Sequence, residues 1–397
     1  MKLSNLLLIL FLFSVLLPQP AHSSMSREFN VSKACLFVSP DDSYREISSL
    51  IKSSNKSILI ATYSFTNPSL GEDLLDAKRR EVNVTVMVEG SPVGGLKEDV
   101  ISYISKNVSV FLNENDDYDY HHAKYAVFDG KITLVSTENF GVEGMSPDPT
   151  YGNRGWFALI YDENVSRFFS SVFYDDLDKS SKYFKDRRFT SAKVNHGRYV
   201  PRFGMKCCRD ANVIVFFGPN VTENVLNFIK SSKGKIWIEQ FYIYKNWDHG
   251  SNPLLEKVIN ESESKDVKVL LDSSWYNMKK DKPNSNYNTL IYLKKNNISA
   301  KVLDKKSTGL LKLHTKGGVT RDSVLISSVN WNEHSIMKNR EVGVIVRCNG
   351  APEFFSDVFT HDYYTNSQTG GSIPKFVVLV LSFGGIAFLL YAGIKLR

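Results

Sequence analysis

The amino-acid sequence predicts an α/β fold made of two duplicated α/β/α sandwich halves related by pseudo-twofold symmetry. Two observations lead to this prediction. Residues 51–60, Ile-Lys-Ser-Ser-Asn-Lys-Ser-Ile-Leu-Ile, closely match residues 229–238, Ile-Lys-Ser-Ser-Lys-Gly-Lys-Ile-Trp-Ile. After each match, strand-like and helix-like stretches alternate in the same order, which is typical of a sheet with helices on its faces.

Each half is expected to open with an amphipathic helix, because apolar residues such as Ile47, Leu50 and Ile51 fall on one helical face. A strand follows, then a second helix and a second strand. In the second half this second helix has Asn252 as its expected N-cap and Pro253 at its first position. The predicted strands are residues 58–63 and 84–88 in the first half and residues 236–242 and 267–271 in the second.

The two ends of the chain carry apolar stretches of different kinds. A charged start, a short apolar run and a small-residue exit predict a signal peptide over residues 1–23. An apolar stretch flanked by basic residues predicts a transmembrane helix over residues 375–395, preceded by a stalk over residues 366–374. An uncleaved anchor and a buried core helix are the alternatives. We therefore expect a single-pass protein of the cell membrane whose main body is extracellular.

Between these ends the duplication predicts one repeat over residues 33–178, a linker over residues 179–209 and a second repeat over residues 210–365. The formal net charge is +7, and four basic residues lie in the predicted terminal segments, which leaves about +3 for the rest. This balance argues against a strongly basic nucleic-acid footprint. Disulfides and free buried thiols both remain possible for the cysteines, which are Cys35, Cys207, Cys208 and Cys348.

Each half contains a histidine followed two residues later by a lysine, and then a short segment that ends in asparagine. Residues two apart on a strand share a face, so the imidazole and the ammonium of each pair would point the same way. Each half therefore offers an imidazole, a cation and an amide that converge on one anion. These residues are His122, Lys124 and Asn139 in the first half, and His314, Lys316 and Asn330 in the second.

This doubled set supplies what the cleavage of a phosphodiester needs. One neutral histidine attacks phosphorus and forms a covalent phosphoenzyme, while the other protonates the leaving oxygen and then activates water. The two lysines and the two asparagines, Asn139 and Asn330, would bind the non-bridging oxygens. This chemistry requires no metal and no other cofactor, and the sequence contains no obvious metal-binding cluster.

The pattern H-x-K-x4-D-x6-(G/S)-(S/T)-x-N, present twice, resembles the signature of the phospholipase D superfamily. An Asn-Arg pair follows each copy, at Asn153-Arg154 and at Asn339-Arg340. The resemblance implies a metal-independent phosphodiester hydrolase that acts through a covalent phosphohistidine on phospholipid or nucleic acid outside the cell. It implies no protein partner. The catalytic residues that it implies are His122 as nucleophile, His314 as acid and base, Lys124, Asp129, Lys316 and Glu341.

The second copy departs from the signature. Arg321 stands where the first copy has Asp129, and Asp322 follows one place later. Either Asp322 takes over the structural support that the family assigns to this aspartate, or the support is lost. The family also places a glutamate behind a catalytic histidine. Glu341 matches that glutamate in the second half, whereas Gly155 occupies the matching position in the first.

Three further interpretations remain open. The same fold occurs in catalytically inactive relatives, so a surface binding module is one alternative to hydrolysis. A phosphatidyltransferase, in which an alcohol replaces water, is another. The acidic run over residues 114–119 is either a solvated loop, a calcium site or an acidic lip, and His121 is expected to be structural.

Overall fold

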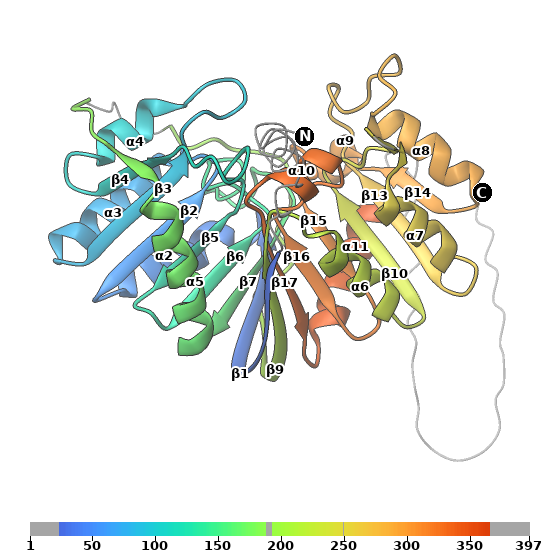
Figure 1. The fold of residues 1–397 in the computed structure, drawn as a ribbon, viewed down its shortest axis with the longest axis horizontal. Helices are drawn as coiled ribbons and strands as arrows, with labels where there is room; N and C mark the ends of the chain where they lie inside the picture. The colour runs from blue at the N-terminus through green and yellow to red at the C-terminus, as the bar shows by residue number, and fades with distance from the viewer. Residues whose placement is uncertain (1–23, 188–192, 249, 366–397) are drawn as a thin grey trace, which may run out of the picture.

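The computed structural model describes residues 24–187, 193–248 and 250–365, and one mixed sheet of 15 strands runs through it (Figure 1). The first half contributes β1 (Met25–Ser39), β2 (Ser57–Thr62), β3 (Asn83–Glu89), β4 (Ser109–Asn113), β5 (Tyr125–Phe128), β6 (Ile132–Ser136), β7 (Gly155–Tyr161) and β8 (Ser180–Tyr183). The second half contributes β9 (Lys206–Phe217), β10 (Lys235–Gln240), β13 (Asp266–Leu271), β14 (Ser299–Val302), β15 (Lys316–Val319), β16 (Val324–Ser327) and β17 (Val342–Arg347). A small separate ribbon pairs β11 (Asn246–Trp247) with β12 (Gly250–Ser251).

The order of the strands is the same in both halves. Outward from the centre it is β1-β7-β6-β5-β2-β3-β4 in the first half and β9-β17-β16-β15-β10-β13-β14 in the second. The two innermost strands, β1 and β9, pair antiparallel and lie side by side in the middle of Figure 1. The predicted α/β fold is therefore confirmed, but the two halves share one continuous sheet instead of forming separate sandwiches.

The second part of the central strand β1, residues 34–39, is buried on both faces, which explains how this strand can join two halves. Its side chains alternate, as the period of a strand requires. Leu36 and Val38 belong to the core that α5 and α11 cover, whereas Cys35 and Phe37 belong to the core beneath α2 and α3. Both faces of the junction are therefore covered by apolar packing.

Helices cover both faces of the sheet. The helices α5 (Glu163–Leu177) and α11 (Ala351–Tyr364) pack on one face, around the central strands. On the other face, the first half carries α2 (Ser43–Ser53), α3 (Pro68–Arg79) and α4 (Glu98–Ile104), and the second half carries α6 (Thr222–Ser231), α7 (Pro253–Glu261) and α8 (Asn286–Lys295). Two short helices, α9 (Lys305–Thr308) and α10 (Glu333–Lys338), complete the second half.

Two of these helices begin with the same cap. The side chain of Asn67 accepts hydrogen bonds from the first-turn amides of α3, and the side chain of Asn252 does the same for α7. A proline occupies the first position of each helix, where no backbone donor is needed. The cap that the sequence predicted at Asn252 is confirmed.

Two disulfides fasten the centre of the sheet. Cys35 of β1 is bonded to Cys207 of β9, and Cys208 is bonded to Cys348, which directly follows β17. Both bonds therefore hold β9, the strand through which the second half joins the first.

The segments between and beyond the halves differ from the sequence-based boundaries. The predicted linker, residues 179–209, contains the edge strand β8 and the start of β9, and its Tyr199 is buried. The predicted signal peptide, stalk and transmembrane helix lie outside the described residues. Within the described ranges, no helix is both long enough and apolar enough to cross a membrane.

Candidate active site

The two histidine motifs meet at the junction of the halves. His122 and Lys124 lie just before β5, and His314 lies just before β15, whose first residue is Lys316; this corrects the prediction that each His-Lys pair lies on one strand. The backbone amide of His122 donates to the carbonyl of Arg340 at 2.9 Å, and the amide of His314 donates to the carbonyl of Arg154 at 2.9 Å. Each motif is thus bridged to the Asn-Arg segment of the other half.

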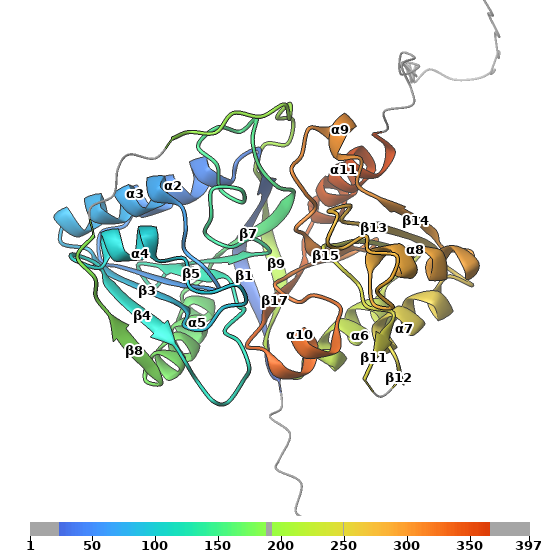
Figure 2. The same ribbon diagram turned by 90° about the horizontal axis from the view of Figure 1, so that it is seen from above.

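A cavity of about 500 Å³ opens at this junction, and both histidines line it. Figure 2 shows the two halves side by side, with α10 next to β17 at the line where they meet. The side chains of His122 and His314 are 15% and 13% exposed, so each ring is held in the wall and still reaches the cavity. The other lining residues are mainly aromatic rings and amides, which are Tyr63, Tyr120, Phe241, Tyr242, Asn139, Asn330, Asn332 and Asn339.

The histidine of the first half is held by a carboxylate of the second half. Nδ1 of His122 lies 2.9 and 3.0 Å from the two carboxylate oxygens of Glu341. The hydroxyls of Ser328 and Ser335 and the amide of Asn339 also donate to Glu341. Burial lowers the pKa of His122 to about 4, although Glu341 opposes this shift. Burial alone would raise the pKa of Glu341, but His122 and its other donors hold that pKa below the usual value.

The histidine of the second half lies beside a carboxylate of the first half, and the sequence did not predict this residue. Nδ1 of His314 is 3.1 Å from Oε2 of Glu138, within ion-pair distance but without the alignment of a hydrogen bond. Burial lowers the pKa of His314 well below its usual value, and the nearby Lys316 lowers it further. Burial raises the pKa of Glu138, although Lys316 opposes that shift. Glu138 belongs to the Ser-Thr-Glu-Asn segment of the motif itself. A carboxylate within that segment is the sequence feature that could have predicted its place beside a histidine.

Both lysines are fully buried beneath the cavity. Nζ of Lys124 donates to the carbonyl of His122, and Nζ of Lys316 donates to the carbonyls of His314 at 2.7 Å and Thr137 at 3.2 Å. Burial lowers the pKa of Lys124 to about 7 and lowers that of Lys316 well below its usual value. Both ammonium groups are therefore poorly solvated, and an anion in the cavity would stabilise their charged form.

An aromatic ring flanks each histidine. The ring of Tyr63 lies 5.2 Å from that of His122, and the ring of Phe241 lies 4.7 Å from that of His314. These residues directly follow β2 and β10, so they occupy corresponding places in the two halves. Tyr63 is a site residue that the sequence did not single out, because nothing in a strand-end tyrosine distinguishes it from a core residue.

The two predicted phosphate-binding asparagines reach the cavity from equivalent segments. Asn139 and Asn330 both line it. Among the described residues, the side-chain oxygens of Asn139 and Asn330 are buried and have no hydrogen-bond partner. Buried polar atoms normally have partners. These two oxygens are therefore free to accept a hydrogen bond from a ligand.

The aspartate of the signature lies outside the cavity. Asp129 accepts hydrogen bonds from the backbone amides of Asn55, Lys56 and Ser57, at 2.7–3.2 Å. Asp129 thus holds the backbone at the start of β2 in place, so its role is structural and it does not contact a substrate. Asp322 does not repeat this contact. It accepts from the hydroxyl of Thr320 and lies 3.9 Å from Nζ of Lys233, so the second half lacks the support.

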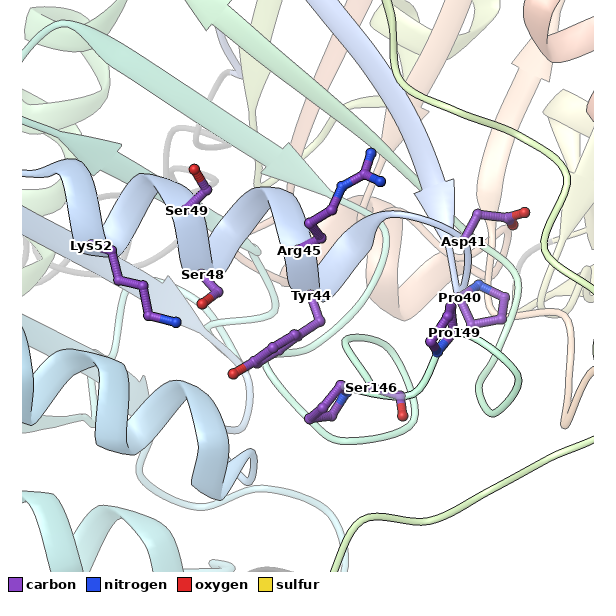
Figure 3. A pocket seen from close by; sticks show the side chains of 10 residues that line it. Pro40, Asp41, Tyr44, Arg45, Ser48, Ser49, Lys52, Ser146 and Pro149 are labelled. Atoms are coloured by element: carbon purple, nitrogen blue, oxygen red, sulfur yellow. The ribbon is translucent and has the colours of Figure 1, made fainter.

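A second cavity lies elsewhere and carries no comparable chemistry. It has a volume of about 560 Å³ and lies along α2, where Tyr44 and Ser48 face the loop around Ser146 (Figure 3). Its two cations are already paired, Lys52 with Asp73 and Arg45 with Asp42.

Two other interpretations from the sequence can be compared with the structure. His121 is fully buried with Nε2 3.6 Å from Asp176, as a structural role requires. In the part of the chain that the structure describes, no group of three His, Cys, Asp or Glu side chains could hold a metal ion, and this includes the acidic run over residues 114–119.

The sequence of this chain is similar to a known family and to a known relative. The family described as "Cardiolipin synthase, PLD-like domain" matches residues 47–177 and 225–363, one match in each half. Mitochondrial cardiolipin hydrolase of Xenopus laevis is 25% identical over 117 residues, which are 28% of this chain and 51% of that protein. The matched part is thus about half of that relative's own length.

Two solved structures are similar to this chain at low sequence identity. Phosphatidylserine synthase of Haemophilus influenzae Rd KW20 has a TM-score of 0.60 at 13% identity, with 84% of this chain and 86% of that chain covered. Nuc, a phospholipase D family member from Salmonella typhimurium, has a TM-score of 0.34 at 20% identity, with 41% of this chain and all of that chain covered. The first of these similarities shows a shared fold.

The family match covers more than half of the chain, and each matched segment contains one His-x-Lys motif and one Asn-Arg segment. This is a family of phosphodiester hydrolases and phosphatidyltransferases. The chain belongs to the PLD-like family described as cardiolipin synthase, and with it to the phospholipase D superfamily.

Proposed function

We propose that this protein is a metal-independent phosphodiester hydrolase that works through a covalent phosphohistidine. The observation that carries the proposal is the reciprocal pairing at the junction. Each histidine lies beside a buried carboxylate of the other half, and both histidines line one cavity together with Asn139 and Asn330. Such an arrangement suits a substrate phosphate held between two imidazoles.

His122 is the proposed nucleophile. Its Nδ1–H donates to the ionised carboxylate of Glu341, which leaves the lone pair on Nε2 directed away from that carboxylate. Nε2 attacks phosphorus, an N–P bond forms, and the P–O bond to the leaving group breaks. Protonated His314 gives its proton to the leaving oxygen.

In the second step, water attacks phosphorus opposite the N–P bond, on the side from which the leaving group departed. Now neutral, His314 takes a proton from water as the oxygen attacks phosphorus, and the N–P bond breaks to release His122. The non-bridging oxygens accept hydrogen bonds from Lys124, Lys316 and the asparagine amides throughout. Binding of the anionic phosphate also favours the protonated forms of both lysines and of His314, whose pKa values burial lowers.

We propose phospholipid or nucleic acid as the source of the phosphodiester. Mitochondrial cardiolipin hydrolase and phosphatidylserine synthase support the lipid, and the aromatic lining of the cavity supports either a base or an apolar group. We further propose an extracellular site on a single-pass membrane protein anchored through residues 375–395. The two disulfides support an oxidising compartment.

The test uses the full-length chain in detergent and EDTA. Single-stranded DNA, RNA, phosphatidylcholine vesicles and cardiolipin vesicles are the substrates, each with and without added glycerol. We expect hydrolysis of one class, and replacement of His122 by Ala should lower kcat by more than about 10⁴-fold. A glycerol adduct as the main product would instead indicate a transferase. A folded protein that binds but never turns over any substrate would indicate the inactive binding module.

A further inference from the structure

Three of the matched positions at which the two half-sites differ concern the carboxylates beside the histidines. When the Ser-x-x-Asn segments are superposed in sequence, Glu138 corresponds to Val329 and Gly144 corresponds to Ser335. The Asn-Arg segments match Gly155 with Glu341 in the same way. The carboxylate that approaches a histidine therefore comes from a different segment in each half.

In the second half, the histidine-binding carboxylate and its donor occupy two of these positions. Glu341 approaches His122, and the hydroxyl of Ser335 donates to it at 2.5 Å. Val329 is fully buried in the apolar core of that half. The position that corresponds to Glu138 thus has no polar role there.

In the first half, the side chain of Glu138 fills the space that a glutamate at position 155 would need. A Cβ atom added to Gly155 would lie 2.4 Å from Cγ of Glu138, and one added to Gly144 would lie 2.6 Å from its Oε2. Real Cβ atoms do not approach other heavy atoms this closely, so Glu138 and side chains at positions 144 and 155 exclude one another. The two glycines make room for Glu138.

Besides His314, Glu138 has the charge of Lys316 near it and one weak hydrogen-bond donor. Its side chain is 3% exposed, and Asn153 donates to Oε2 at 3.3 Å. Among the described residues, Oε1 has no hydrogen-bond partner. A buried carboxylate with an unsatisfied oxygen destabilises the fold, so its presence beside His314 points to a role in the reaction.

We propose that Glu138 is the positioning residue for His314 and replaces the glutamate that is missing at position 155. This inference rests on the proposed function. Glu138 holds the ring so that Nε2 of His314 faces the substrate phosphate. It also stabilises the positive charge that His314 carries before it protonates the leaving oxygen and after it accepts a proton from water. Glu138 does not touch the substrate.

The test compares the full-length wild type with four variants on bis-(p-nitrophenyl) phosphate. Nitrophenolate leaves without acid catalysis, so the first step depends on His122 and the second on His314. We expect E138Q to release one equivalent of nitrophenolate as a burst and then turn over on the order of 10²-fold more slowly. E341Q should lose the burst itself. The variant E138V/G144S/G155E rebuilds the arrangement of the second half, and it should recover most of the turnover that E138V loses.

Two further measurements separate positioning from general damage to the fold. Since neutral His314 activates water in the second step, the acidic limb of the pH profile of kcat should move to lower pH in E138Q and return in the triple variant. Histidine NMR of the unreacted protein should show the pKa of His314 lower in E138Q, with His122 unchanged. The control E163Q, on the exposed first turn of α5, should match wild type in every assay.

The outcomes are distinguishable from those of the proposed function. If the wild type does not turn over, the proposed function fails, and the NMR titration still decides whether Glu138 acts on His314. If E138Q turns over at the wild-type rate, or the pKa of His314 does not move, the inference on Glu138 is wrong. Failure of the triple variant to exceed E138V while it remains folded would also overturn it.

Discussion

The two halves of the site have the same strand order and the same histidine, lysine and asparagine, but they differ in electrostatics. Glu341 receives hydrogen bonds from two serines and an asparagine, and its pKa is lowered. Glu138 has one weak donor, and burial raises its pKa. A duplicated scaffold can therefore hold two chemically different histidines, one beside a firmly ionised carboxylate and one beside a carboxylate that ionises less readily. This difference supports a nucleophile in the first half and an acid and base in the second.

The largest expected effect is the loss of activity when either histidine is replaced, and the two replacements should block different steps. With bis-(p-nitrophenyl) phosphate, His122→Ala should release no burst of nitrophenolate, and its rate should fall by more than about 10⁴-fold. His314→Ala should still form the phosphoenzyme, because nitrophenolate needs no proton, and then stall. Protein denatured at alkaline pH, where the N–P bond is stable, should carry a nitrophenyl-phosphohistidine, detected by mass spectrometry, in the second variant alone. The opposite pattern would exchange the roles of the two residues.

The buried arginines extend the comparison to stability. Arg154 is fully buried and pairs with both Asp41 and Asp362, whereas Arg340 is 11% exposed and pairs with Asp176. Arg154→Met would leave two buried carboxylates without their cation. We expect it to cost about 3–5 kcal/mol in the free energy of unfolding, against about 1–3 kcal/mol for Arg340→Met. Urea unfolding of both variants checks the difference, and equal losses would contradict it.

The pH dependence of kcat/KM tests the role of the buried lysine of the first half. Because burial lowers the pKa of Lys124 to about 7, its ammonium is present below that pH and is lost as the pH rises. We expect kcat/KM of the wild type to fall as the pH increases through about 7. Lys124→Met should lower kcat by about 10²–10³-fold and remove this limb. A limb that persists in the variant would assign the titration to another group.

Part of this site could be predicted from the sequence, and the structure shows why the rest could not. The His-x-Lys spacing and the Ser-x-x-Asn segments are local, so both half-sites were visible as repeats. The role of Glu138 was not visible. Its side chain, from the loop after β6, fills the space that a glutamate at position 155 of β7 would occupy, and only the three-dimensional structure shows this. The single sheet was also hidden. It depends on the pairing of β1 with β9, two strands far apart in the sequence, and no local periodicity specifies such a partner.

The smallest expected effect concerns the aspartate that only the first half retains in its supporting place. Partial burial alone would raise the pKa of Asp129, but three backbone amides hold it below the usual value. Its charge therefore stabilises the fold at pH values above its unfolded pKa, and this stabilisation is lost as the pH falls through the folded pKa. Asp129 has a φ of +54°, a conformation that asparagine also tolerates, so Asp129→Asn removes the charge with little change in the backbone.

We expect this substitution to cost about 1–2 kcal/mol at pH 7, after allowance for solvent screening, and less at pH 3, which lies below the usual pKa of an aspartate. Asp322→Asn is the matched control. Its side chain is 44% exposed and holds no backbone amide of β10, so its loss should stay within about 0.5 kcal/mol at either pH. Thermal unfolding at both pH values measures the two differences. A loss for Asp322→Asn as large as that for Asp129→Asn would mean that the second half has kept its support after all.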